Sequence, residues 1–122
     1  MQLNLQTDYA LRVLMYLARK DSELATIREI AEYFRISEHH LVKVVHQLSL
    51  KGFICSLRGR NGGIALARPP EAINVGDVIR NMESHFNVVE CFNPASQGCR
   101  LLPACRLKGL LYQAREAFLK TR

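Results

Sequence analysis

Apolar residues in the first half of the chain recur with the spacing of amphipathic helices. The pattern predicts a first helix over residues 7–20, which a Thr-Asp pair at its start can cap. Thr26 and Glu29 have the spacing of a capping box, and Ser37 is a candidate N-cap for a third helix that ends at Gly52. The expected buried stripes are Leu11, Leu14, Met15 and Ala18, then Ile30, Ala31 and Phe34, then Leu41, Val44, Val45 and Leu48.

The period of the pattern changes to two after the third helix. Two short apolar segments flank the sequence Gly59-Arg60-Asn61-Gly62-Gly63, in which Asn and Gly can supply the positive φ angles of a tight turn. The pattern therefore predicts a β-hairpin with Arg58 and Arg60 at its tip. Cys55 lies on the apolar side of the first strand, so we expect it to be a small buried core residue.

The rest of the chain predicts two further helices separated by an irregular segment. Asn74 can cap a fourth helix that reaches Met82, whereas residues 84–103 show no clear period. A final amphipathic helix begins near Ala104, and its apolar stripe is larger than a small domain needs for its own packing. Self-pairing would bury this stripe, so we expect a homodimer. The stripe consists of Leu107, Leu110, Leu111, Ala114 and Phe118.

Together these elements predict a mainly α fold with a small β-hairpin. Two short helices, a longer one and a basic hairpin follow the order of a winged helix-turn-helix, whose third helix enters the DNA major groove while the wing contacts the backbone or minor groove. We expect a winged helix-turn-helix DNA-binding domain over residues 1–83, a cysteine-bearing loop over residues 84–105 and a C-terminal dimerisation helix over residues 104–122.

The charge distribution indicates a nucleic-acid partner. The chain of 122 residues has a net charge of +6, and the stretch from His39 to Arg68 carries five basic residues and no acid. Such a local field attracts phosphate, although an ordinary solvated helix face is the alternative. Lys and Gln on one side of the third helix can read base edges. The residues expected to contact double-stranded DNA are Ser37, His39, His40, Lys43, Gln47, Arg58, Arg60 and Asn61.

Composition and motifs argue against several classes of protein. With 48% hydrophobic and 23% charged residues, the chain has the composition of a globular domain. Its apolar runs are too short to span a bilayer and its N-terminus does not resemble a signal peptide, so we expect a cytoplasmic protein without a membrane partner. We expect no enzymatic activity, since neither a nucleophile–base set nor a phosphate-binding loop is evident.

Three of the four cysteines lie near one another in the sequence. Cys91, Cys99 and Cys105 fall in or beside the irregular segment, and thiolates select zinc or iron-sulfur clusters. Three ligands are one short of a closed four-ligand site, and the spacing lacks the C-x2-C knuckle of many zinc sites. The spacing alone leaves metal ligation and three ordinary thiols equally open.

Five segments cover nearly the whole chain and carry a family resemblance. They are TDYALRVLMYLA at 7–18, HHLVKVVHQLSLKG at 39–52, RGRNGGIALARP at 58–69, INVGDVIRNME at 73–83 and CRLLPACRLKGLL at 99–111. Together they resemble the NsrR-type repressors, a branch of the winged-helix family that also includes IscR. The resemblance implies a homodimer on a palindromic operator, with one iron-sulfur cluster per subunit. It also implies that nitric oxide attacks the cluster iron and so lowers DNA affinity.

The resemblance also assigns ligands. It implies that Cys91, Cys99 and Cys105 bind the cluster and that Asp8 reaches the cluster of the partner subunit. Asp8 can instead stabilise the first turn of its helix through the macrodipole, and His85 is an alternative ligand. The resemblance favours [4Fe–4S], while the donor set leaves [2Fe–2S] open.

Two other functions are compatible with the residues. The same DNA-binding fold can sense cluster supply or redox state instead of nitric oxide. From another class, the chain can be a small zinc-stabilised interaction module whose basic stretch has no role in binding DNA.

Overall fold

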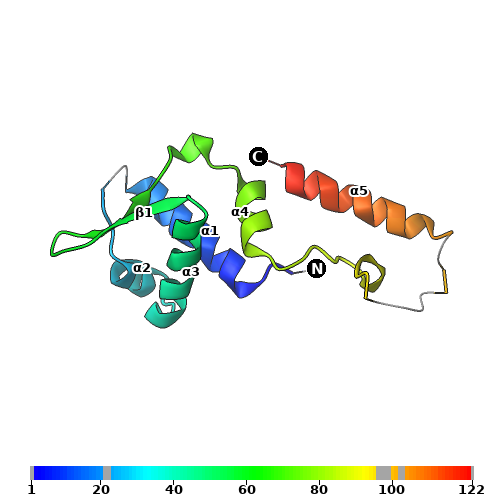
Figure 1. Cartoon of the computed structure of the whole chain (residues 1–122), viewed down its shortest axis with the longest axis horizontal. Coiled ribbons are helices and arrows are strands. Elements are labelled where there is room, and N and C mark those ends of the chain that lie inside the picture. The colour runs from blue at the N-terminus through cyan, green and yellow to red at the C-terminus, as the bar shows by residue number, and fades with distance from the viewer. Residues whose placement is uncertain (1, 21–22, 96–99, 102–103, 122) are drawn as a thin grey trace.

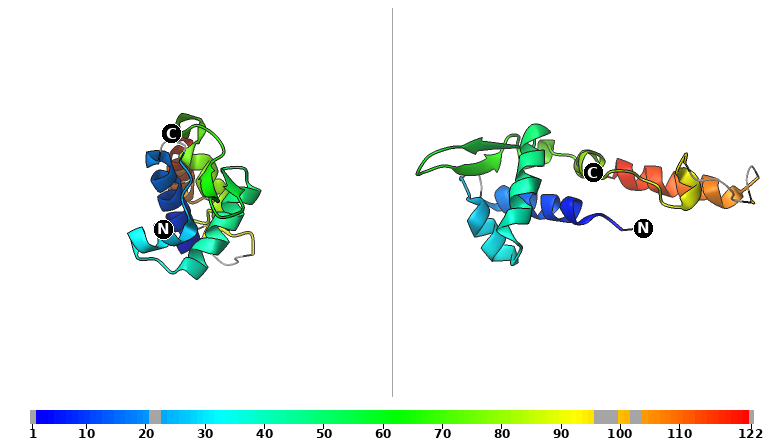
Figure 2. Two further views of the ribbon diagram at one scale, coloured as in Figure 1. Left: turned by 90° about the vertical axis from the view of Figure 1, so that its left-hand side faces the viewer. Right: turned by 60° about the horizontal axis from the view of Figure 1, so that its bottom comes forward.

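The computed structural model describes residues 2–20, 23–95, 100–101 and 104–121. It confirms a mainly α fold with a two-stranded hairpin (Figure 1). Two views agree that the molecule is elongated, with the hairpin at one end and the first turns of α5 at the other (Figure 2). The elements in chain order are α1 (Leu5–Arg19), α2 (Ile27–Phe34), α3 (Glu38–Leu50), β1 (Ile54–Leu57), β2 (Gly63–Leu66), η1 (Pro70–Ala72), α4 (Val75–Met82), η2 (Glu90–Phe92) and α5 (Arg106–Lys120).

Helix α1 begins earlier than its Thr-Asp pair predicts. Asn4 is the N-cap, and its Oδ1 accepts a hydrogen bond from the Thr7 backbone N–H at 2.8 Å. Thr7 is buried inside the first turn, where its hydroxyl bonds to the same Oδ1 atom at 3.0 Å. The predicted cap is therefore wrong: the capping side chain belongs to Asn4, three residues before Thr7.

The predicted buried face of α1 is also one position out of register. The helix buries Ala10, Val13, Leu14 and Leu17, whereas Met15 is 59% exposed. Both stripes have helical spacing, and packing of α1 against α3, α4 and β2 selects between them.

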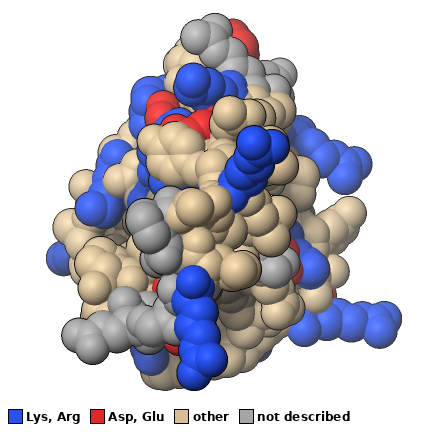
Figure 3. Space-filling model, turned by 90° about the vertical axis from the view of Figure 1, so that its right-hand side faces the viewer, with Lys and Arg blue, Asp and Glu red and all other residues tan. Residues whose placement is uncertain are grey.

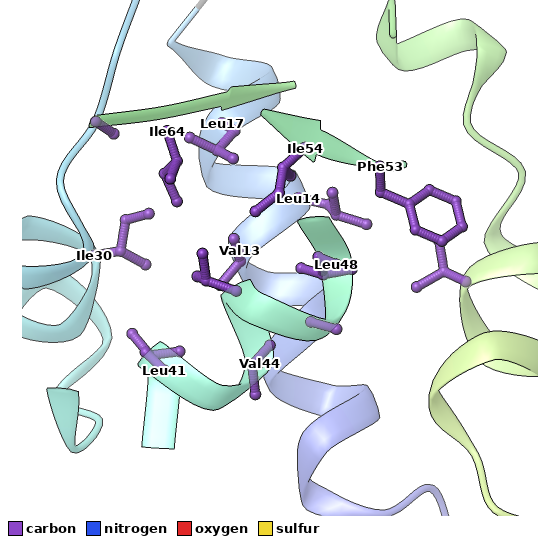
Figure 4. Packing of buried hydrophobic residues seen from close by; sticks show 14 of the residues in the cluster. Val13, Leu14, Leu17, Ile30, Leu41, Val44, Leu48, Phe53, Ile54 and Ile64 are labelled. Carbon is purple, nitrogen blue, oxygen red and sulfur yellow. The ribbon is translucent and has the colours of Figure 1, made fainter. Parts of the chain in front are cut away.

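Helices α2 and α3 follow their predicted patterns. Thr26 and Glu29 form both hydrogen bonds of the capping box, and Gly52 takes a positive φ of 81° directly after the C-cap of α3. Ser37 is the N-cap residue of α3, but its side chain makes no capping hydrogen bond. The core of the domain lies between α1, α3 and the hairpin (Figure 4). The α3 residues in this core are Leu41, Val44, Val45 and Leu48, as predicted.

The antiparallel hairpin packs against the body with the opposite face to the one expected. Ile54 pairs with Leu66 and Ser56 with Ile64, and the side chains of Ile54 and Ile64 are buried. Cys55 therefore points to the other face and is exposed, so the prediction of a buried core thiol is wrong. Phe53 and Ile54 are both buried because the chain enters the strand directly from the core.

The hairpin turn differs from the prediction, because a different residue takes the positive φ angle. Gly59 has a φ of 112°, and the Asn61-Gly62-Gly63 sequence has no positive φ. Gly62 is needed for space instead, because a Cβ atom there would overlap the carbonyl oxygen of Leu57. The Arg-bearing tip thus depends on two glycines for two different reasons.

Helix α4 connects the domain to α5. Asn74 caps α4 as predicted, and the Arg80 guanidinium donates to the Leu119 carbonyl oxygen at 2.9 Å. Buried Gly76 lies so close to the same carbonyl that a Cβ atom there would overlap it. These contacts hold the C-terminal end of α5 on α4, while the N-terminal end extends away from the domain (Figure 1).

Candidate functional site

The surface expected to contact DNA consists of one face of α3 and the hairpin tip. The buried stripe of α3 faces α1, so its polar residues lie on the opposite, solvent side. Figure 2 shows the hairpin projecting from the body beside α3. That these residues touch DNA stays a prediction, although all of them are exposed as such contacts require. They are Ser37, His39, His40, Lys43, Gln47, Arg58, Arg60 and Asn61.

A polar network joins α1 to α2. Glu29 accepts from the Tyr16 hydroxyl at 2.7 Å and from the Thr26 backbone N–H at 2.9 Å, and it pairs with Lys20 at 3.1 Å. These donors hold the pKa of Glu29 below its ordinary value, with the Tyr16 hydroxyl contributing most. The pKa of Tyr16 is raised, mainly because its hydroxyl donates to this carboxylate. The network sets the position of α2 relative to α1.

The second part of the site is a cavity that contains two of the three predicted cluster cysteines. Cys91 lies inside the irregular segment and Cys105 just after it, yet both line the same cavity of about 210 Å³. Both thiols are half-buried. The other lining residues are Val89, Glu90, Leu101, Leu107, Lys108 and Leu111.

The lining of this cavity suits a thiolate-bound metal group. Half of its lining residues are apolar, and Lys108 and Glu90 place one positive and one negative charge beside the two thiols. Thiolates are soft ligands that favour iron-sulfur clusters and zinc. Figure 3 shows the end of the molecule that carries this segment, where mostly uncharged surface is surrounded by lysines and arginines and few acids are visible. The chemistry and shape therefore fit an anionic cluster.

Among the described residues, no further predicted ligand lies at this cavity. Cys99 lies outside the described residues, and without it those residues contain no group of three metal-ligating side chains. Asp8 is in the first turn of α1, where it pairs with Arg12 at 2.9 Å. Neither Asp8 nor His85 lines the cavity of Cys91 and Cys105. A ligand role for Asp8 thus requires a second chain.

Sequence reasoning missed two groups that organise this site. The Asn4 backbone N–H donates to Glu83 Oε1 at 2.7 Å, which joins the start of α1 to the start of the cysteine-bearing segment. Arg115 on α5 contacts Phe86, five residues before Cys91, and Phe92, directly after it. Both contacts join residues far apart in the chain, so no local pattern indicates them.

Comparison with known sequences identifies relatives over almost the full chain. The profile of the Rrf2 family, described as "Iron-dependent Transcriptional regulator", matches residues 3–121. A transcriptional regulator NsrR of Shouchella clausii is 48% identical over 98% of this chain and 81% of its own length. The NsrR regulator of Bacillus subtilis is 46% identical over 98% of this chain and 82% of its own length.

Solved structures share the fold. A transcriptional regulator from Listeria innocua superposes with a TM-score of 0.79 at 28% identity, covering 97% of this chain and 77% of that one. The oxidized form of CymR from Staphylococcus aureus gives 0.74 at 30% identity, over 98% of this chain and 86% of that one. IscR from T. potens gives 0.74 at 23% identity, over 98% and 78% of the two chains. The similarity to IscR supports the winged-helix architecture.

Proposed function

This chain belongs to the Rrf2 family of transcriptional regulators, and we propose that it is a homodimeric repressor whose iron-sulfur cluster senses nitric oxide. It is a DNA-binding regulator of the NsrR type, and the comparisons supply the basis for that statement. The observation that carries the cluster proposal is the shared cavity of Cys91 and Cys105, whose lining suits thiolate-bound iron. The relatives are named NsrR, and nitric oxide is the signal that the resemblance to NsrR-type repressors implies.

We assign the ligands by combining the cavity with the position of Asp8. Cys91, Cys99 and Cys105 hold one [4Fe–4S] cluster per subunit, and the fourth ligand is Asp8 of the partner subunit. The bound cluster supplies iron that reacts with nitric oxide. An aspartate oxygen is a harder and more labile ligand than thiolate, so the iron it holds is the accessible one.

The residues around Asp8 provide a path from the cysteine segment to the DNA-binding surface. Asn4 caps α1 and donates hydrogen bonds to the carboxylate of Glu83, which lies directly before that segment, while Asp8 follows one turn later. Helix α1 then packs on α3 through its buried face. A displacement of the first turn of α1 is thus passed to the helix that carries His40 and Lys43. Since dimer geometry sets the spacing of two such helices on a palindromic operator, a small shift lowers affinity.

The proposal is tested by anaerobic purification and DNA binding. We expect a coloured protein that contains iron and sulfide, and a gel shift of operator DNA that sub-stoichiometric nitric oxide reduces. A shift that nitric oxide leaves unchanged would point to cluster supply or redox state as the signal. A colourless protein with one zinc per chain and no affinity for duplex DNA would contradict the proposal.

Substitution of Asp8 separates its ligand role from its helix role. We expect Asp8→Ala to change the absorption spectrum of the cluster and the dose of nitric oxide that releases DNA. Glu32→Ala is the matched control, because Glu32 also forms an exposed i,i+4 pair with an arginine, Arg28 at 3.5 Å. An Asp8→Ala protein with the wild-type spectrum and response would exclude Asp8 as a ligand.

A further inference from the structure

Arg115 is a largely buried guanidinium on α5 that the proposed function does not use. Its side chain is 19% exposed and lies between two aromatic rings, with Cζ 4.9 Å from the Phe92 ring centroid and 4.8 Å from that of Tyr112. Nη1 donates to the Phe86 carbonyl oxygen at 3.2 Å. One side chain therefore joins two points of the cysteine-bearing segment to α5.

These contacts place Cys91 with respect to Cys105. Phe86 and Phe92 bracket Cys91 in the sequence, and Cys105 is the N-cap residue of α5, the helix that carries Arg115. By fixing the segment to the helix on both sides of Cys91, the guanidinium brings two thiols that are distant in sequence to one cavity. A planar guanidinium suits this role because it can stack and donate at the same time.

The charge of Arg115 is incompletely matched. It pairs with Glu116, 3.4 Å from Nη2, and its buried Nε–H has no hydrogen-bond partner among the described residues. A buried cation with a donor left over favours a nearby anion. Arg115, Cys91 and Cys105 line one cavity of about 430 Å³, together with Lys108. The anion that this cavity suits is the group held by the thiolates.

We propose that Arg115 is a positioning residue for the thiolate-bound group: it holds the segment bearing Cys91 against α5 and directs an Nε–H donor toward that group. The second half rests on the proposed function, whereas the first half concerns the protein with or without iron. Donors to cluster sulfur and nearby positive charge make a cluster easier to reduce. The positioning role and the donor role are therefore tested by separate measurements.

The positioning half is tested by amide hydrogen exchange of the full chain without iron. We expect Arg115→Gln to raise the exchange rate in residues 86–93 about tenfold, because the segment loses its anchor on α5. We also expect faster exchange in Arg115→Lys, since lysine lacks the planar fork. Lys120→Gln removes the same charge from an exposed position of α5 and should leave exchange unchanged. Wild-type exchange in both Arg115 variants would overturn this half.

The donor half is tested by the reduction equilibrium of the iron-loaded protein. We expect Arg115→Gln to lower the equilibrium constant for one-electron reduction about tenfold, which is about 59 mV, with a smaller shift in the same direction for Arg115→Lys. Full restoration by lysine would assign the effect to charge alone and overturn the donor. A wild-type reduction potential in Arg115→Gln would also overturn the donor role.

The two measurements also separate this proposal from the function on which it rests. If Arg115→Gln takes up no iron, the reduction potentials of wild type and Arg115→Lys are compared instead. Equal potentials would overturn the donor role of Arg115. If the wild-type protein itself takes up no iron, the proposed cluster fails and the donor half falls with it, while hydrogen exchange still decides the positioning half.

Discussion

Arg60 shows what a single residue at the hairpin tip is expected to contribute. It is exposed and lies in the acid-free stretch, at the tip of the hairpin that projects from the body beside α3 (Figure 2). If it contacts one phosphate, Arg60→Ala weakens binding to all DNA sequences and reduces the slope of log affinity against log salt by about one unit. Titrations of operator and unrelated duplexes at several salt concentrations measure both quantities.

The control for Arg60 removes a cation elsewhere. Lys120→Ala takes one positive charge from the exposed end of α5 and should leave the salt slope unchanged. If Arg60→Ala lost affinity only for operators with one particular base pair, the side chain would read that base directly instead of a phosphate.

Gly76 is a residue whose role depends on one close contact. A Cβ atom there would overlap the Leu119 carbonyl oxygen, so Gly76→Ala must push α5 away from α4. We expect a loss of about 1–3 kcal/mol in the free energy of unfolding, as for other overpacked sites. Urea denaturation followed by circular dichroism measures the change.

Gly109 provides the matched comparison for Gly76. It lies in the interior of α5 with open space where a Cβ atom would stand. Alanine has the higher helix propensity, so Gly109→Ala should be neutral or stabilising by up to about 1 kcal/mol. Equal destabilisation by the two substitutions would show that the Gly76–Leu119 contact is not the cause.

At the scale of elements, the Glu29 network couples the start of α2 to α1. The pKa of Glu29 is lower in the folded protein, so its stabilising contribution is present above its ordinary pKa of 4.5 and is lost as pH falls through the folded pKa. We expect Glu29→Gln to cost about 1 kcal/mol near neutral pH, as other capping losses do. The difference from wild type should shrink in acid.

Unfolding curves from neutral pH to below the folded pKa of Glu29 check this dependence. Glu32→Gln is the control, because Glu32 is an exposed carboxylate of the same helix whose pair with Arg28 is 72–77% exposed. A stability difference for Glu29→Gln that stays constant across the pH range would show that the ionised carboxylate is not what couples the helices.

At the scale of the whole molecule, α5 leaves most of its apolar stripe exposed. Leu107 and Leu110 are 58% and 61% exposed, whereas Leu111 is half-buried in the lining of the cysteine cavity. Phe118 at the other end of the stripe is exposed as well. This arrangement supports the predicted dimer, on which the proposed ligand role of Asp8 depends.

A charge in the stripe should dissociate the dimer. We expect Leu110→Asp to raise the dissociation constant at least about 30-fold, since burial of a leucine contributes about 2 kcal/mol. Sedimentation velocity over a range of concentrations measures it. Gln113→Asp introduces the same charge on an exposed position of α5 outside the stripe. If Leu110→Asp and Gln113→Asp had the same dissociation constant, α5 would not be the dimer interface.

Local patterns were sufficient for most of the secondary structure. The capping box at Thr26 and Glu29, the Asn74 cap and the core stripe of α3 are all determined by residues within one or two helical turns of each other. The same is true of the acid-free stretch, because its charge depends only on composition. The five segments that carry the resemblance also indicated the family, and the match to the Rrf2 profile confirms it.

Tertiary contacts decided what local patterns left ambiguous. Two apolar stripes fit α1, and packing on α3, α4 and β2 buries the one with Val13 instead of the one with Met15. Cys55 is exposed because Ile54 and Ile64 occupy the inner face of the hairpin. Contacts over long sequence separations also bring Cys91 to Cys105 and Arg115 to both. The sequence by itself thus determined elements and charge, whereas burial and the shape of the thiol cavity depend on which distant residues the fold brings into contact.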